Sequence, residues 1–361
     1  MKQYRIACVL LAVIVFAACA APGVRAQGAG VELGGGGIFR PKNPEIKRRT
    51  AGPRPATRRP VNRPANRPVN KPAAAPGANA AEIEEDFEDA LDEGNEARDA
   101  RDYSKAEQAY RDALQLKPRD ARAAYGLGNI YTDQQRWEDA EKFYRQAVEF
   151  SPNHADALVA LSYVLVQTRT GAGNARRLAD AELFARRAVQ LQPGNAVAQD
   201  RLGVALEERA ILNNDTEQAY RRAVELDPQF AIAYAHLGRL LRKMNRAGEA
   251  EPFYSKAVEL ARDAPTLILV ADAMQSEQRW GDSEPVLKRA LQLDAKNPNA
   301  HFLLGRLYIV AKRFADAEQE LKSTIEISPR SFQPHNLLGR AYLGLERFED
   351  AEKIYARAAE L

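Results

Sequence analysis

The sequence predicts an all-α fold behind residue 80, built from about eight copies of one helical hairpin. Three columns of recurring residues carry this prediction. A small residue returns at intervals of 33 to 41 residues, at Gly94, Gly128, Ser162, Gly203, Gly238, Ala271, Gly305 and Gly339. An alanine follows it at Ala106, Ala140, Ala181, Ala250, Ala317 and Ala351, and a proline closes most copies, at Pro118, Pro152, Pro193, Pro228 and Pro329. Proline cannot continue a helix, so the third column marks helix ends.

Each copy has apolar residues at three- and four-residue spacing in both halves, which is typical of two amphipathic helices. One such hairpin cannot bury its apolar face alone, so neighbouring copies must stack. The eight predicted units are 87–120, 121–154, 155–195, 196–230, 231–263, 264–297, 298–331 and 332–361. The small column indicates that two helices approach closely there. We therefore expect an elongated stack of hairpins behind residue 80.

Unit 121–154 resembles the tetratricopeptide pattern, with Leu127-Gly128 and Tyr131 in its first half and Ala140 and Tyr144 in its second. The resemblance to the tetratricopeptide repeat (TPR) family extends over about 275 of the 361 residues. It implies a right-handed superhelical solenoid whose first helices line a concave groove. Unit 155–195 departs from the pattern by seven extra residues, so we expect either a longer hairpin or a glycine-rich loop there.

Residues 1–26 have the features of an export signal. Lys2 and Arg5 precede an apolar run that Pro22 ends, and small residues stand before a cleavage point after Ala26. We predict a cleaved signal peptide. The alternative is lipidation at Cys19, which closes the sequence Phe-Ala-Ala-Cys; there the protein would stay anchored as a lipoprotein.

Residues 27–80 form a predicted disordered linker rich in proline and basic residues. They hold eleven basic and two acidic residues, whereas residues 81–361 carry a net charge of −9. We interpret the linker mainly as a solvated spacer. Two alternatives remain: a weak contact of residues 40–72 with an anionic surface, or attraction of the linker to the acidic stretch Glu82–Glu93 of the first unit.

No pattern for catalysis is found, and we predict no enzyme, no cofactor and no metal site. The two cysteines, Cys8 and Cys19, both precede residue 27. This leaves the repeats without a thiol nucleophile or a thiolate ligand. The basic overall charge comes from the linker, so it does not indicate nucleic-acid binding by the repeats.

The resemblance implies that side chains flanking the small column face the groove. The candidate partner-binding residues are Tyr125, Asn129, Tyr163, Arg239, Arg242, Phe302, Arg306 and Arg340. The four arginines would hold an acidic peptide, and Tyr163 and Phe302 would supply apolar contact. The alternative is a solvated face without one ligand. One branch of the family uses a lysine, an asparagine and further basic residues to bind the carboxylates of a peptide C-terminus. Unit 121–154 has Tyr125 at the position of that lysine, so we do not assign this type of site.

These observations predict a non-enzymatic protein–protein interaction scaffold of the bacterial cell envelope, exported to the periplasm or the outer envelope, or secreted. The alternative is an outer-membrane lipoprotein or assembly factor, similar to pilotins, anchored through Cys19. The last predicted unit ends at Leu361 without a polar capping helix. We therefore also expect self-association at that end.

Overall fold

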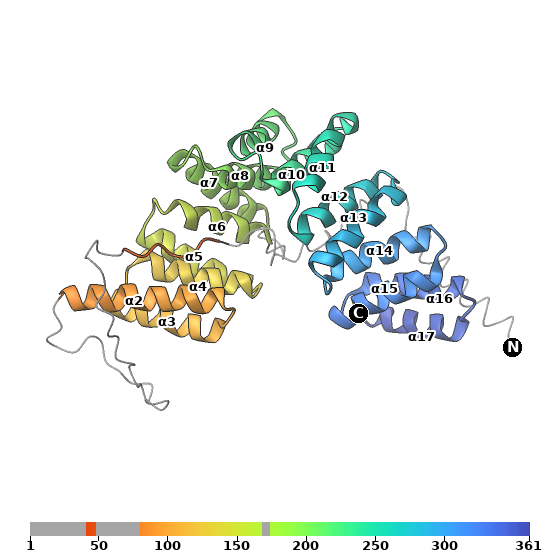
Figure 1. Ribbon diagram of the computed structural model, residues 1–361, viewed down its shortest axis with the longest axis horizontal. Helices are drawn as coiled ribbons and strands as arrows, with labels where there is room; N and C mark the ends of the chain where they lie inside the picture. The colour runs from red at the N-terminus through yellow and green to blue at the C-terminus, as the bar shows by residue number, and fades with distance from the viewer. Residues whose placement is uncertain (1–40, 48–79, 168–173) are drawn as a thin grey trace, which may run out of the picture. The chain divides into compact units, whose positions relative to one another are not determined.

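The computed structural model describes residues 41–47, 80–167 and 174–361, and in this part of the chain all regular secondary structure is helical (Figure 1). The all-α prediction is confirmed. The predicted signal peptide and most of the predicted linker lie outside the described residues. The chain divides into two compact bodies, which we describe separately. The first contains Phe39–Leu226 and the second contains Asp227–Leu361.

Paired helices build the first body, two in each repeat. They are α2 (Ala80–Asp99), α3 (Tyr103–Leu116), α4 (Ala121–Asp133), α5 (Trp137–Phe150), α6 (Ala155–Gln167), α7 (Asn174–Leu191), α8 (Ala196–Glu208) and α9 (Asn214–Leu226). Helix α2 begins seven residues before the predicted first unit. In the predicted long unit, α7 has 18 residues where α5 has 14, so the extra residues lengthen the second helix in part. Residues 168–173 lie outside the described residues.

The second body repeats the same arrangement. Its helices are α10 (Ala231–Lys243), α11 (Ala247–Leu260), α12 (Ala264–Ser276), α13 (Trp280–Leu293), α14 (Pro298–Val310), α15 (Phe314–Ile327), α16 (Phe332–Gly344) and α17 (Phe348–Ala359).

In both bodies, several first helices start at a capping residue whose side chain accepts a hydrogen bond from the backbone of the first turn, as Asp120, Asn195, Asp263 and Asn297 do.

The small column is explained by a close approach between the two helices of a hairpin. A Cβ atom added at Gly94 would lie 2.6 Å from Cε1 of Tyr110, and one added at Gly128 would lie 2.4 Å from Cε1 of Tyr144. Both tyrosines are fully buried. The missing side chain therefore lets each tyrosine ring cross the first helix, and the tyrosine hydroxyl reaches the residue after the glycine.

The turn inside each described hairpin has a Schellman geometry. In unit 121–154 the amide of Gln135 donates to the carbonyl of Thr132 (3.0 Å), and the amide of Arg136 donates to that of Tyr131 (2.8 Å). Gln135 itself has a positive φ of 59°. The equivalent residues of other hairpin turns also have a positive φ: Arg101, Ala210, Asn245, Gln278, Lys312 and Glu346. None is glycine, so these turns carry backbone strain.

Lys312→Gly is expected to stabilise the second body by about 0.5–1 kcal/mol, because glycine adopts a φ of 58° without a Cβ clash. Lys312 is exposed. Thermal unfolding of the full chain measures the change. Asn245→Gly is the matched control at the equivalent turn, with a smaller expected gain because asparagine tolerates this conformation. Equal or lower stability of Lys312→Gly would show that the turns are unstrained.

Candidate peptide-binding groove

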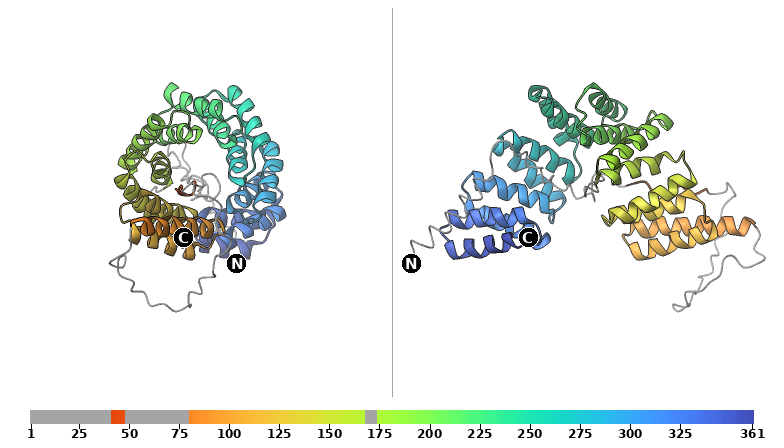
Figure 2. Two further views of the ribbon diagram at one scale, coloured as in Figure 1. Left: turned by 60° about the vertical axis from the view of Figure 1, so that its left-hand side comes forward. Right: turned by 180° about the vertical axis from the view of Figure 1, so that it is seen from behind.

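Residues 41–47 of the predicted linker lie against α2 and α4 of the first body. The segment, Pro-Lys-Asn-Pro-Glu-Ile-Lys, has no regular secondary structure. It is drawn in red-orange and runs along the inner side of the curve formed by the helices of the first body (Figure 2). We call these residues the linker segment. The surface beneath it is the groove, formed by Glu88, Asn95, Arg98, Asp99, Arg122 and Asn129.

Two asparagines at equivalent positions of successive repeats hold the main chain of the linker segment. Asn95 Nδ2 donates to the carbonyl of Pro44 (3.1 Å), and Asn129 Nδ2 donates to the carbonyl of Lys42 (2.8 Å). The other amide atom of each asparagine accepts from the hydroxyl of a buried tyrosine, Tyr110 at 2.7 Å and Tyr144 at 2.9 Å. The tyrosines thus fix which amide atom faces the segment.

Arg98 links the two repeats and the linker segment. Its Nε and Nη2 donate to the two carboxylate oxygens of Asp133, at 2.7 and 2.9 Å. Nη1 donates to the carbonyl of Pro41 and to Oδ1 of Asn43, both at 2.8 Å. Only 1% of Arg98 is exposed. Such a bidentate pair holds the guanidinium plane in one orientation, so Arg98 is set in place to bind the segment.

A second charged cluster holds the other end of the linker segment. Arg122 Nη1 donates to the carbonyl of Glu45 (3.0 Å) and to Oε1 of Glu88 (2.9 Å). Glu88 in turn accepts from the amide of Lys47 (2.7 Å) through Oε2. Asp120 accepts from Arg122 Nη2 (3.0 Å). Glu88 lies in the acidic stretch that was one alternative for attraction of the linker, and its hydrogen bond with the linker segment is to the main-chain amide of Lys47.

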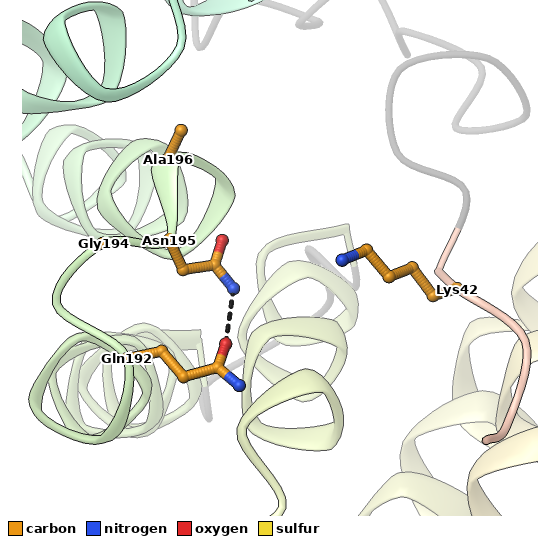
Figure 3. Close-up of a pocket in the computed structure, with 5 residues that line it drawn as sticks. All are labelled: Lys42, Gln192, Gly194, Asn195 and Ala196. Atoms are coloured by element: carbon orange, nitrogen blue, oxygen red, sulfur yellow. Dashed lines mark hydrogen bonds between the residues drawn. The ribbon is translucent and has the colours of Figure 1, made fainter.

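Lys42 directs its side chain away from these contacts. Figure 3 shows it reaching across a hollow of about 430 Å³ toward Gln192 and Asn195, which are themselves joined by a hydrogen bond of 2.8 Å. Gly194 and Ala196 complete the lining. The groove therefore holds the main chain at this position and leaves room for the side chain.

Of the predicted groove residues in the first body, Asn129 contacts the linker segment, whereas two tyrosines are built into the core. Tyr125 is 2% exposed, and its ring lies 4.9 Å from that of His154. Tyr163 is 3% exposed and meets Trp137 edge to face at 6.1 Å. Burial raises the pKa of Tyr163 to about 12. Their main structural contribution is packing between helices.

In the second body, two of the predicted basic residues, Arg242 and Arg306, lie close to carboxylates. Arg306 donates to Asp272 and to Gln275, both at 2.8 Å. Arg242 lies 3.9 Å from Glu277. These partners offset part of the positive charge on which the predicted acidic-peptide site depends.

Three further predicted residues lie on first helices of the second body. Arg239 is on α10 and half-buried, Phe302 is on α14 and half-buried, and Arg340 is on α16 and exposed. An acidic peptide at these residues stays a prediction, as does lipidation at Cys19, which lies outside the described residues.

The sequence interpretation missed Asn95, Arg98 and Arg122. One signal for Asn95 was present: the dipeptide Gly-Asn occurs at Gly94-Asn95 and again at Gly128-Asn129, each with a tyrosine fifteen residues after the asparagine. Arg98 had no such signal, because threonine stands at the equivalent position of the next repeat.

The described residues contain no group of three or more His, Cys, Asp or Glu side chains placed to hold a metal ion. Among these residues, no helix is both long and apolar enough to cross a membrane. His301, one of two histidines at equivalent repeat positions, is bound at Nδ1 to Glu320 (2.6 Å), and this hydrogen bond raises its pKa.

Stacked helical hairpins with a close glycine contact in the small column define a helical-repeat protein. Models of the tetratricopeptide repeat match residues 91–155, 231–263, 275–338 and 311–361, which together make up about half of the chain. The chain belongs to the tetratricopeptide repeat family. This class of repeat serves as a scaffold for protein–protein interaction.

Three solved structures are similar to parts of this chain. A tetratricopeptide repeat protein from Parabacteroides merdae has 14% identity and a TM-score of 0.54, covering 71% of this chain and 99% of its own. YrrB, described as a TPR protein with an unusual peptide-binding site, has 22% identity and a TM-score of 0.40, covering 50% and 88%. MamA has 23% identity and a TM-score of 0.41, covering 49% and 92%. A search of curated proteins finds no match.

Proposed function

We propose that the protein is a non-enzymatic scaffold that binds an extended segment of a partner protein in the groove of its first two repeats. The observation that carries this proposal is the linker segment itself. Side chains of α2 and α4 donate to the carbonyls of Pro41, Lys42, Pro44 and Glu45, four of five consecutive residues. A surface that satisfies this many main-chain carbonyls is a binding site for extended peptide.

Contacts inside the repeats hold the groove donors in one orientation. Asn95 and Asn129 are fixed by the buried tyrosines, and Arg98 is fixed by Asp133. Preorganised donors need little ordering on binding, which favours affinity. Five hydrogen bonds of the groove reach main-chain atoms of the linker segment, four at carbonyls and one at the amide of Lys47. They can therefore act on any extended segment whose side chains fit the groove.

Asn129→Asp is expected to weaken binding of groove partners by about fivefold to a hundredfold. The carboxylate still accepts from Tyr144, but its second oxygen would face a peptide carbonyl in place of a donor. A lost hydrogen bond with an opposed acceptor costs about 1–3 kcal/mol, and about 1.4 kcal/mol is a factor of ten. Quantitative affinity capture from the source cells, with the full chain as bait, measures the recovery of each partner.

Gly248→Ala is the matched control for this capture, because Gly248 lies in the second body with no atom within 4 Å of the added Cβ. Partners of the groove are lost with Asn129→Asp and retained with Gly248→Ala, and circular dichroism checks that both variants fold. Equal recovery of every partner with Asn129→Asp would place binding outside the groove.

For the location of the scaffold we propose export to the cell envelope, supported by the charged, apolar and small-residue regions of residues 1–26. Phe16–Cys19 supports the second candidate, an assembly factor anchored as a lipoprotein. Mass spectrometry of the mature N-terminus separates them. A chain starting at Gln27 fits the unanchored scaffold, a diacylated Cys19 fits the lipoprotein, and an intact Met1 contradicts both.

A further inference from the structure

We infer that the groove is selective for the sequence Pro-x-Asn-Pro in an extended peptide, and that Pro41–Pro44 is its tethered ligand. This inference rests on the proposed function and adds the ligand's chemistry. It is carried by three features: a two-sided contact to the asparagine side chain, burial of both prolines, and free space around the side chain of Lys42.

The asparagine is recognised through both atoms of its amide. Oδ1 of Asn43 accepts from Arg98 Nη1 (2.8 Å), and Nδ2 donates to Asp99 Oδ2 (3.0 Å). A neighbouring donor and acceptor match a carboxamide, which offers an acceptor and a donor on one planar group. An aspartate in place of Asn43 would set a carboxylate oxygen against the carboxylate of Asp99, where no hydrogen bond can form. An apolar residue at this position would remove one acceptor from Arg98. The pair Arg98–Asp99 therefore selects asparagine.

At the positions of the two prolines, the groove side chains donate hydrogen bonds, and proline offers only an acceptor in its main chain. Pro41 and Pro44 are buried, and both of their carbonyls accept from groove side chains. Proline has no amide hydrogen, so neither residue brings a buried donor that would need an acceptor. Proline also restricts the free peptide to extended conformations, which lowers the entropy lost on binding.

Lys42, between Pro41 and Asn43, is bound to the groove through its main chain. The carbonyl of Lys42 accepts from Asn129, while its side chain reaches over the hollow toward Gln192 and Asn195 (Figure 3). The hollow leaves room for a side chain as long as that of lysine. For this reason the second position of the motif is written x.

The linker contains natural near-matches to the motif. Pro-x-Asn recurs at residues 60–62, 64–66 and 68–70, but a basic residue follows the asparagine each time, where the linker segment has Pro44. A basic side chain with its amide hydrogen does not fit the buried position of Pro44. These stretches therefore lack the last position of the motif.

Tethering makes the linker segment a competitor of any partner. Thirty-two residues separate it from α2 in the sequence. Because the segment and the groove belong to one chain, the local concentration of the segment exceeds that of a free peptide. A partner's apparent affinity is its intrinsic affinity multiplied by the fraction of chains whose groove is open. A partner with the same motif must displace the linker segment, so weakening the segment strengthens partner binding.

Fluorescence anisotropy with a labelled peptide of residues 39–48 tests this inference on the full chain. The receptors are the wild-type chain, the Asn43→Ala chain, and a chain with Asn43→Ala and Asn129→Asp. Asn43 lies in the linker, so its substitution leaves the repeats intact. We expect the wild-type peptide to bind the Asn43→Ala chain at least tenfold more tightly than the wild-type chain, and binding to be lost when Asn129→Asp is added.

Variant peptides separate selectivity from peptide binding. Asn43→Ala, Asn43→Asp and Pro44→Arg peptides are expected to bind the Asn43→Ala chain at least tenfold more weakly than the wild-type peptide. Equal binding of all four would overturn the selectivity and leave the proposed groove function standing. Binding that Asn129→Asp does not change would overturn the proposed function. Equal affinity for the wild-type and Asn43→Ala chains, or concentration-dependent dimers of the wild-type chain in sedimentation, would overturn the tethered ligand.

Discussion

Gly128→Ala is expected to destabilise the first body by about 1–3 kcal/mol, the range for overpacking a well-packed core. The added Cβ would lie 2.4 Å from Cε1 and 2.5 Å from Cδ1 of Tyr144, closer than atoms can approach. The ring cannot easily move, because it is fully buried and its hydroxyl is bound to Asn129 and to Thr132, both at 2.9 Å. Denaturant unfolding of the full chain measures the loss.

Gly248→Ala is again the control. Gly248 is helical and exposed, and an added Cβ meets no atom within 4 Å. Alanine favours a helix over glycine, so this variant is expected to be unchanged or more stable by up to about 1 kcal/mol. Gly128→Ala is also expected to weaken peptide binding, because displacing Tyr144 releases the amide of Asn129. A Gly128→Ala chain as stable as the control would mean that the helices tolerate a larger separation.

Breaking the Arg98–Asp133 pair is expected to have the largest effect on stability. Arg98→Met leaves the carboxylate of Asp133, whose side chain is 8% exposed, without its bidentate partner. Removal of one member of a buried pair typically costs about 3–5 kcal/mol. Asp133→Leu is expected to cost a similar amount, because the buried guanidinium of Arg98 then loses both of its hydrogen bonds to the Asp133 carboxylate.

The double variant Arg98→Met, Asp133→Leu separates charge burial from shape. It is expected to be more stable than either single variant, because no uncompensated charge remains in the interior. Peptide binding is lost in the double variant all the same, since Nη1 of Arg98 no longer donates to the peptide. Additive losses in stability would contradict coupling between the two side chains.

The sequence allowed the fold to be predicted because each repeat carries the same local information. Gly128 and Tyr144 recur as matched columns, and one contact between them explains both. The positive φ at Lys312 and its equivalents was not predicted, because non-glycine residues occupy those turns and give no signal in the sequence. Helix α2 begins at Ala80, one residue before the predicted repeat region and seven before the first predicted unit, because its first seven residues lie outside the repeat pattern.

The site was harder to predict because it depends on contacts between residues far apart in the chain. Asn129 was identified from its place beside the small column. Arg98 binds the linker segment 55 to 57 residues away, and no periodicity links those positions. The linker's composition suggested a spacer or a charge-driven contact. Its bound part, Pro41–Pro44, is held instead by donors to carbonyls, which composition does not reveal.

The central claim is that the linker segment occupies the groove of its own chain, and the rate of tryptic cleavage after Lys42 tests it most directly. The carbonyl of Lys42 is bound to Asn129 Nδ2, so cleavage of the Lys42–Asn43 bond requires the segment to leave the groove. We predict that this bond is cleaved at least tenfold more slowly in the full wild-type chain than in a free peptide of residues 39–48. In the Asn129→Asp chain the rate should approach that of the peptide. Equal rates in the wild-type chain, the variant and the free peptide would contradict the account.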